Sequence, residues 1–323
     1  MATTRSDREM RRAETPTGDL ETYAVADTYH DWIKQEGVRH IVDFAFEDLK
    51  AIEMTPWERK GGRGAIITIP NEHLATDSHV VELAPGAKSA PEHHMYEEVV
   101  YVLSGRGATS VWTDEKRKQT FEWHEGSLFA IPLNAWYQHF NASGSEPARY
   151  IAVTNAPPMM RLFRNNDFIF NSDYMFTDRF PDDDAYFNGT GKLYKKRRWE
   201  TNFIPSTANM ALYDDSERGA GNINVDLEMA SGGIKPHMSE FPVGTYKKAH
   251  RHGPGAHLIL LRGTGGFSLL WQEGQEPRKA DWKEGALVIV PDEACFHQHF
   301  NTGSTPARYL AVKGGNHGLM EPL

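Results

Sequence analysis

Five of the fifteen histidines in this 323-residue chain lie in two short stretches near its C-terminus. His250, His252 and His257 form the first group, and His297 and His299 form the second. In a β-strand, residues two apart point to the same face, so His250 and His252 would project together, as would His297 and His299. Neutral imidazole is a good ligand for Fe, Mn, Zn, Ni or Cu ions. Two such pairs on neighbouring strands of a small barrel can converge on one divalent metal.

The elements that carry these histidines belong to an internal repeat. The phrase QHFNASGSEPARYIAV, residues 138–153, recurs as QHFNTGSTPARYLAV, residues 298–312. Further matches upstream extend the repeated unit to about residues 58–155 and 216–313. The chain therefore contains two copies of one module, and each copy has a histidine in its closing phrase.

Each copy consists of short apolar runs separated by turns. Residues 99–103 and 258–261 are aliphatic runs that end at or near glycine, which is typical of buried strands. Turns that recur about every 8–12 residues favour an antiparallel sandwich or barrel. Helical signal is confined to residues 28–36 and 46–52. We therefore predict an all-β protein with a short helical N-terminal segment, divided into an N-terminal arm, a first module, a connection and a second module: residues 1–57, 58–156, 157–215 and 216–323.

Composition and charge exclude several classes of protein. The net charge of −9 argues against binding to nucleic acid or to an anionic membrane. No apolar run approaches the roughly 18 residues of a membrane span, and the polar N-terminus does not resemble a secretory signal. The single cysteine, Cys295, leaves no internal disulfide and fits a reducing compartment. We expect a cytoplasmic protein.

The second module resembles the cupins. Gly244-TYKKA-His250-Arg-His252 matches the opening of the first cupin motif, G-x5-H-x-H. Gly285-ALVIV-Pro291 followed by His297-QHF-Asn301 matches the second motif, with one extra residue before the histidine. Because the repeat covers both modules, the chain resembles the bicupins. The resemblance implies two jelly-roll barrels, each a double-stranded β-helix, in tandem.

The resemblance further implies that His250, His252 and His297 bind a divalent transition metal. Cupins place a glutamate at the fourth position, where this sequence has Ala256 or His257, depending on the spacing. His257 is therefore either a fourth imidazole ligand or a polar residue at the start of a strand.

Three residues near this metal are candidates for catalytic roles. Tyr246, Glu240 and His299 could act as general bases. His299 has a second interpretation, because its counterpart His139 lies in the weaker first module. The two histidines could share a structural role.

The first module is an altered copy of the same motifs. His94 and Glu98 match the family pattern, but Glu92 stands where the first histidine is expected, and Tyr137 replaces the second-motif histidine. One interpretation is a second metal site with mixed ligands, formed by Glu92 or His93 together with His94, Glu98 and His139. The other is a barrel that only supports its partner.

The repeated P-A-R-Y phrase carries Arg149 and Arg308, one in each module. An arginine in the pocket would bind a substrate carboxylate through two hydrogen bonds. Arg308 and Arg262 are the candidates for this role in the second module. The alternative is that the arginines of the repeat are structural clamps.

The resemblance implies metal chemistry on a small acid. Our leading interpretation is an Fe(II)-dependent dioxygenase, similar to the gentisate and hydroxynaphthoate dioxygenases, that binds an aromatic or dicarbonyl acid together with O2. One alternative is a redox-neutral decarboxylase, lyase or isomerase that uses Mn(II), Zn(II) or Ni(II). Another is a non-catalytic bicupin that binds a metal or a ligand. The resemblance also implies a homodimer or homotetramer.

Overall fold

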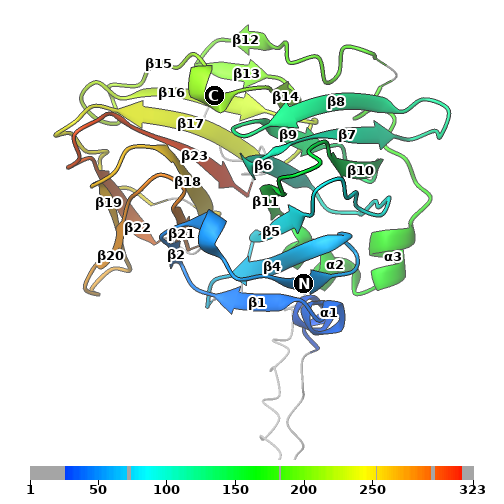
Figure 1. Ribbon diagram of the computed structural model, residues 1–323. Coiled ribbons are helices and arrows are strands. Elements are labelled where there is room, and N and C mark those ends of the chain that lie inside the picture. The colour runs from blue at the N-terminus through cyan, green and yellow to red at the C-terminus, as the bar shows by residue number, and fades with distance from the viewer. Residues whose placement is uncertain (1–25, 71–73, 182, 252, 292–294, 315–323) are drawn as a thin grey trace, which may run out of the picture.

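The computed structural model describes residues 26–70, 74–181, 183–251, 253–291 and 295–314. The chain forms two β-barrels side by side, the first coloured blue to green and the second yellow to red (Figure 1). This confirms the predicted tandem all-β fold. None of the described helices is long and apolar enough to span a membrane.

The first barrel has a larger and a smaller sheet. In the larger sheet the strands run in the order β1-β4-β5-β11-β6-β9-β14, with β3 paired to β4. In the smaller sheet the order is β10-β7-β8. The bounds are β1 (Arg39–Val42), β3 (Thr55–Trp57), β4 (Gly62–Thr68), β5 (Asp77–Leu83), β6 (Glu98–Ser104), β7 (Arg106–Trp112), β8 (Gln119–His124), β9 (Leu128–Ile131), β10 (Trp136–Asn141), β11 (Ala148–Thr154) and β14 (Phe203–Ile204).

The second barrel repeats this arrangement. Its larger sheet has the order β12-β13-β16-β17-β23-β18-β21-β2, with β15 paired to β16, and its smaller sheet has the order β20-β19-β22. The bounds are β2 (Ala45–Phe46), β12 (Lys192–Tyr194), β13 (Arg198–Glu200), β15 (Tyr213–Asp214), β16 (Ile223–Glu228), β17 (Lys235–Phe241), β18 (Ala256–Arg262), β19 (Phe267–Trp271), β20 (Arg278–Asp281), β21 (Leu287–Val290), β22 (Phe296–Phe300) and β23 (Ala307–Lys313).

Helices are few and short. The predicted helix at residues 28–36 is confirmed as α1 (Thr28–Glu36). Its first turn is capped by the Asp27 carboxylate, which accepts from the His30 amide, and Gly37 ends it at φ 63°. The helical signal at residues 46–52 yields only the 3-10 turn η1 (Leu49–Ala51). The connection between the barrels contributes α2 (Ala156–Phe163), α3 (Asn166–Asn171) and the 3-10 turn η2 (Thr207–Asn209).

The structural repeat begins earlier than the sequence match, near β1 and β13. Both strands pair in parallel with the first long strand of their own copy, β4 or β16. The next short strand of each copy then crosses to the other barrel. β2 pairs with β21 of the second barrel, and β14 pairs with β9 of the first. The arm and the connection therefore join the two barrels reciprocally.

Alternation along the strands separates two apolar cores. In β18, Leu258 and Leu260 belong to the cluster inside the second barrel. Ile259, on the opposite face, belongs to a cluster that extends into the first barrel. Because neighbouring residues of a strand face opposite ways, the parity of a residue decides whether it can reach the barrel interior.

Candidate active site in the C-terminal barrel

A cavity of about 120 Å³ lies inside the second barrel. Four histidines line it: His237 from β17, His250 from the loop that follows, and His297 and His299 from β22. Ala256 and Leu258 of β18 and Ala311 of β23 form the apolar part of the wall among the described residues. The structure thus places His250 of the first histidine group and both histidines of the second group around one pocket.

His250 and His297 lie next to each other. They form an antiparallel bridge in which the His250 amide donates to the His297 carbonyl at 3.1 Å, and the His297 amide donates back at 2.9 Å. Their imidazole centroids are 4.2 Å apart. His252 lies outside the described residues. Of the three predicted metal ligands, His250 and His297 are described, and these two side chains lie next to each other.

The backbone fixes which ring nitrogen of His250 can bind a metal. Its Nδ1 lies 2.9 Å from the Lys248 carbonyl oxygen, and the Nδ1 of His297 lies 3.4 Å from the Cys295 carbonyl oxygen. A carbonyl oxygen can only accept, so these contacts favour a protonated Nδ1 and leave the Nε2 lone pair for a metal. Within the described ranges, no group of three or more His, Cys, Asp or Glu is arranged to hold an ion. A complete site would need His252 as well.

His257 does not reach this pocket. It lies on the face of β18 opposite to Ala256 and Leu258, and its Nε2 is 3.2 Å from Thr76 Oγ1 in the first half of the chain. Burial lowers the pKa of His257 to about 4. Strand parity thus contradicts the interpretation of His257 as a fourth ligand and supports the alternative of a polar strand residue.

His299 and His139 share a structural arrangement. His299 Nδ1 lies 2.9 Å from Ser268 Oγ, which accepts from the Trp282 indole at 2.9 Å. In the first barrel the same contacts join His139, Thr109 and Trp123. Burial lowers the pKa of His139 to about 3, and burial together with His297 lowers that of His299 well below its usual value. Both rings are therefore neutral at pH 7.

His237 and its counterpart His79 were missed in the sequence. They lie on equivalent strands, β17 and β5. The two histidines are 158 residues apart, the same offset that relates the neighbouring segments of the repeat. The segments HVVELAPG and HMSEFPVG, which start at these histidines, share their glutamate and final glycine. Extending the repeat comparison into these segments would have found both.

The pocket is strongly cationic. Arg197, Arg218, Lys247, Lys248 and Lys313 line it, against Asp215 and Asp226 among the described residues. Arg197 forms an ion pair with Asp215 at 2.7 Å. Lys247 is only 6% exposed, and its Nζ donates to Tyr309 Oη at 2.8 Å and to Ser239 Oγ at 2.9 Å. No carboxylate of the described residues compensates it.

The predicted substrate arginines are structural. Arg308 Nε donates to Glu240 at 2.7 Å, and its Nη1 donates to the Thr207 and Ala208 carbonyls of η2. Arg262 pairs with the same Glu240. Neither lines the pocket among the described residues, so their positions favour the structural clamp over substrate binding.

The other arginine of the repeat and the catalytic candidate Tyr246 have equally clear positions. Arg149 pairs with Glu82 and donates to the Leu49 and Lys50 carbonyls of η1, which repeats the clamp. Tyr246 is 53% exposed and packs on Phe300 outside the pocket. Its position contradicts a role as general base.

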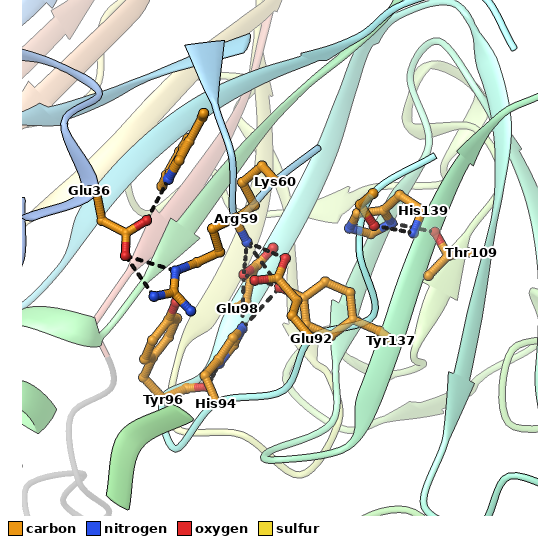
Figure 2. A network of polar contacts seen from close by, with 12 residues as sticks. Glu36, Arg59, Lys60, Glu92, His94, Tyr96, Glu98, Thr109, Tyr137 and His139 are labelled. Atoms are coloured by element: carbon orange, nitrogen blue, oxygen red, sulfur yellow. Dashed lines mark hydrogen bonds and ion pairs between the residues drawn. The ribbon is translucent and has the colours of Figure 1, made fainter. Parts of the chain in front are cut away.

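The equivalent interior of the first barrel is filled by a lysine (Figure 2). Lys60, 1% exposed, donates to Glu92 Oε1 at 2.7 Å and to Tyr137 Oη at 3.0 Å, and its Nζ lies 3.8 Å from Glu98 Oε2. His94 Nε2 lies 3.2 Å from the same Glu98 oxygen. At the position of the second metal site that the sequence suggested, the structure therefore has the ammonium group of Lys60.

The remaining residues of that predicted second site lie elsewhere. His139 is tied to Thr109, as described above. His93 turns away from His94, with its Nδ1 at 2.9 Å from Asn134 Oδ1 and its ring on Trp136. Lys60, Glu92, His94, Glu98 and Tyr137 meet at the polar centre of the barrel (Figure 2).

Residues 79–154 match a family model for the cupin domain, and they cover most of the first barrel. The second barrel repeats its strand order and motif residues. The chain thus has the tandem fold of the bicupins, and its first barrel matches the cupin domain. No curated protein matches its sequence significantly.

Solved structures resemble the chain over most of its length. An oxalate decarboxylase of Bacillus subtilis, described with Mn(II) centres, aligns with a TM-score of 0.55 and 16% identity over 85% of this chain and 78% of the other. The oxalate decarboxylase of Lactobacillus farciminis in its formate complex aligns with a TM-score of 0.56 and 14% identity over 84% and 86%. At such identities the likeness shows the shared fold.

Proposed function

We propose that the C-terminal barrel is a metal-dependent, redox-neutral catalytic centre that removes CO2 from a small carboxylic acid. The observation that carries this proposal is Lys247, a buried ammonium without a carboxylate partner among the described residues, in the pocket of His250 and His297. A buried charge is unfavourable unless an opposite charge compensates it. A substrate carboxylate would supply that charge.

The dimensions of the pocket support a small substrate. Its volume of about 120 Å³ is well below the roughly 300–1,000 Å³ of sites for drug-sized ligands. A short mono- or dicarboxylic acid fits this space better than a bicyclic aromatic acid. The excess of lysine and arginine at the pocket would also attract such an anion.

His250 and His297 would hold a divalent ion through Nε2, with His252 as the third ligand implied by the cupin motif. The fourth family position corresponds to Ala256, which offers no carboxylate. An all-imidazole shell leaves the full charge of the ion, which favours anionic oxygen donors such as a substrate carboxylate. A bound ion would stabilise the negative charge that develops on the substrate when CO2 leaves. We propose Mn(II), since the Bacillus neighbour is described with Mn(II) centres.

The residues around the pocket can hold the substrate and supply one proton. Lys247 would bind the substrate carboxylate, while its Nζ donates to Tyr309 Oη. When the carbon–carbon bond to CO2 breaks, the electron pair stays on the remaining carbon. Tyr309 would protonate that carbon, and Lys247 would return a proton to the tyrosine oxygen. The products are CO2 and the rest of the substrate with a hydrogen in place of the lost carboxylate, and a proton from solvent would restore Lys247.

The fold neighbours support this redox-neutral alternative more than our leading interpretation of an Fe(II) dioxygenase, because they are decarboxylases by name. Neither iron nor ring cleavage receives support from them. The two reactions differ in whether O2 is consumed in proportion to the product.

The test is to load the metal-free protein with Mn(II) and to measure CO2 release and O2 uptake together on a panel of short mono- and dicarboxylic acids. We expect CO2 release without net O2 consumption, abolished in His297→Ala and reduced in Lys247→Met. Lys279→Met, on an exposed lysine paired with Asp281, is the control that keeps activity. Stoichiometric O2 uptake would favour the dioxygenase. An absence of both turnover and carboxylate binding would favour a non-catalytic bicupin.

A further inference from the structure

The interior of the first barrel has the ligands of a cation site, but a lysine stands in it. Lys60 and its neighbours Glu92, His94, Glu98 and Tyr137 are all at most 7% exposed. They come from segments far apart in sequence and meet at one point (Figure 2). By position in the motif, Glu92, His94 and Glu98 correspond to His250, His252 and Ala256 of the other barrel.

We propose that the Lys60 ammonium is the resident cation of the N-terminal barrel, that this barrel therefore takes no metal, and that removing Lys60 exposes a latent divalent-metal site formed by Glu92, His94 and Glu98. The proposal goes beyond the function proposed for the C-terminal barrel and does not depend on it.

The distances between the polar atoms support a latent site. His94 Nε2, Glu98 Oε2 and Tyr137 Oη form a triangle with sides of 3.1, 3.2 and 3.3 Å. Ligand atoms about 2.1 Å from a metal stand about 3.0–3.4 Å apart in octahedral or tetrahedral geometry. His94 and Glu98, two of the three proposed ligands, thus have the spacing of neighbouring ligands of one ion. With Lys60 present, the described residues here are not arranged as a metal site. His94 Nδ1 lies 2.8 Å from the Tyr96 carbonyl oxygen, which favours Nε2 as the metal-binding nitrogen.

The carboxylates have spare capacity for a metal. Glu92 Oε2 and Glu98 Oε1 are buried and have no hydrogen-bond partner in the described structure. Each carboxylate thus directs one oxygen to its neighbours in the cluster and leaves the second available. Two carboxylates and an imidazole are a common ligand set for Mn(II), Zn(II) or Co(II).

Lys60 excludes a metal by both position and charge. Its Nζ lies 2.7 Å from Glu92 and 3.8 Å from Glu98, so it stands between the groups that an ion would need. Paired with two buried carboxylates, the ammonium would also repel a divalent ion.

The backbone around Lys60 has an equivalent in the second copy of the repeat. Gly61, at φ 63°, leaves no room for a Cβ, which would lie 2.9 Å from the Lys88 carbonyl oxygen. In the second copy, Gly219 packs in the same way on the Tyr246 carbonyl. The residue before each glycine is thus equivalent: Lys60 points inward, whereas Arg218 is exposed at the rim of the pocket. Arg218 therefore does not fill the centre of the second barrel as Lys60 fills that of the first.

The experiment counts bound Mn(II) or Zn(II) per chain, by calorimetry and elemental analysis, in the wild type and in Lys60→Ala. We expect one additional equivalent in Lys60→Ala and a melting temperature that rises with metal more than in the wild type. Adding Glu98→Gln should abolish the additional equivalent. Lys50→Ala, which removes an exposed lysine paired with Glu125, is the matched control and should leave the count unchanged.

A second arm does not depend on the folding of Lys60→Ala. In the otherwise wild-type chain, Glu98→Gln should leave metal content unchanged, whatever the C-terminal barrel binds. A loss of one equivalent on Glu98→Gln would overturn the claim that the first barrel is metal-free. A Lys60→Ala protein that gains no metal, or that stays unfolded with metal, would overturn the latent site. If the C-terminal proposal alone fails, the wild type binds no metal and Lys60→Ala still gains one equivalent.

Discussion

The two barrels have the same strand order but opposite interiors. The first is closed around Lys60, Glu92 and Glu98, whereas the second has a cavity beside His250 and His297. The two interiors differ by single substitutions at a few equivalent positions, for example Glu98 in the first barrel and Ala256 in the second. One fold can thus use its central polar positions either for stability or for ligand binding. Lys60 represents the first use and Lys247 the second.

The largest effect is expected from the first of these lysines. Lys60→Met leaves Glu92 and Glu98 buried without their cation, which should lower the free energy of unfolding by about 3–5 kcal/mol. Urea denaturation measures this change. Lys50→Met, which breaks an exposed pair with Glu125, should cost at most about 1 kcal/mol. Equal losses in the two variants would remove the distinction between the barrels.

The second lysine should behave in the opposite way. Lys247→Met should weaken binding of a small carboxylate by about 10–100-fold, because a charged hydrogen bond contributes about 1.5–3 kcal/mol. Its stability should be unchanged or higher, since the variant removes an uncompensated buried charge. Titration calorimetry and urea denaturation on the same samples test both statements. A strong loss of stability with unchanged affinity would assign Lys247 to the framework.

His257, at the contact between the barrels, should make stability depend on pH. Burial lowers its folded-state pKa to about 4, so below the unfolded value of about 6.5 the unfolded chain takes up a proton that the folded chain does not. Its contribution to stability is therefore complete above pH 6.5 and lost as the pH falls towards 4. His257→Gln should remove a decline on the order of 1–3 kcal/mol over this window. An unchanged slope, or lost metal binding, would contradict our placement of this residue.

The smallest effect is expected for Arg262. Its side chain is half exposed and shares Glu240 with Arg308, so Arg262→Met should change stability by less than about 1 kcal/mol and leave carboxylate affinity unchanged. Calorimetric titration with the best carboxylate checks the second statement. Weaker carboxylate binding in this variant would show that Arg262 contacts the substrate.

The repeat made much of this architecture predictable. It yielded the tandem barrels and the pairing of His139 with His299, because long matched segments carry strand periodicity and position together. The helix α1, outside the repeat, was predicted from its own local pattern. The exchange of β2 and β14 between barrels was not predictable, since two-residue strands have no period to recognise. The sequence match therefore begins after β1 and β13, the strands with which the structural repeat begins.

The site was predictable only in part. His250 and His297 are adjacent, as their motif positions suggested, but His257 was assigned by spacing when strand parity should have decided. Lys60 was missed because it lies in the charged run ERK, 32 residues before Glu92, where a sequence favours a surface position. Only the folded barrel brings that lysine between two carboxylates.

The central claim is that a metal serves the second barrel and a lysine serves the first. Anomalous diffraction from crystals of the Mn(II)-loaded protein, recorded on both sides of the manganese edge, tests it most directly. We predict one peak per chain, about 2.2 Å from Nε2 of His250 and of His297, and none between Glu92 and Glu98. A peak between Glu92 and Glu98, with Lys60 displaced, would contradict the account.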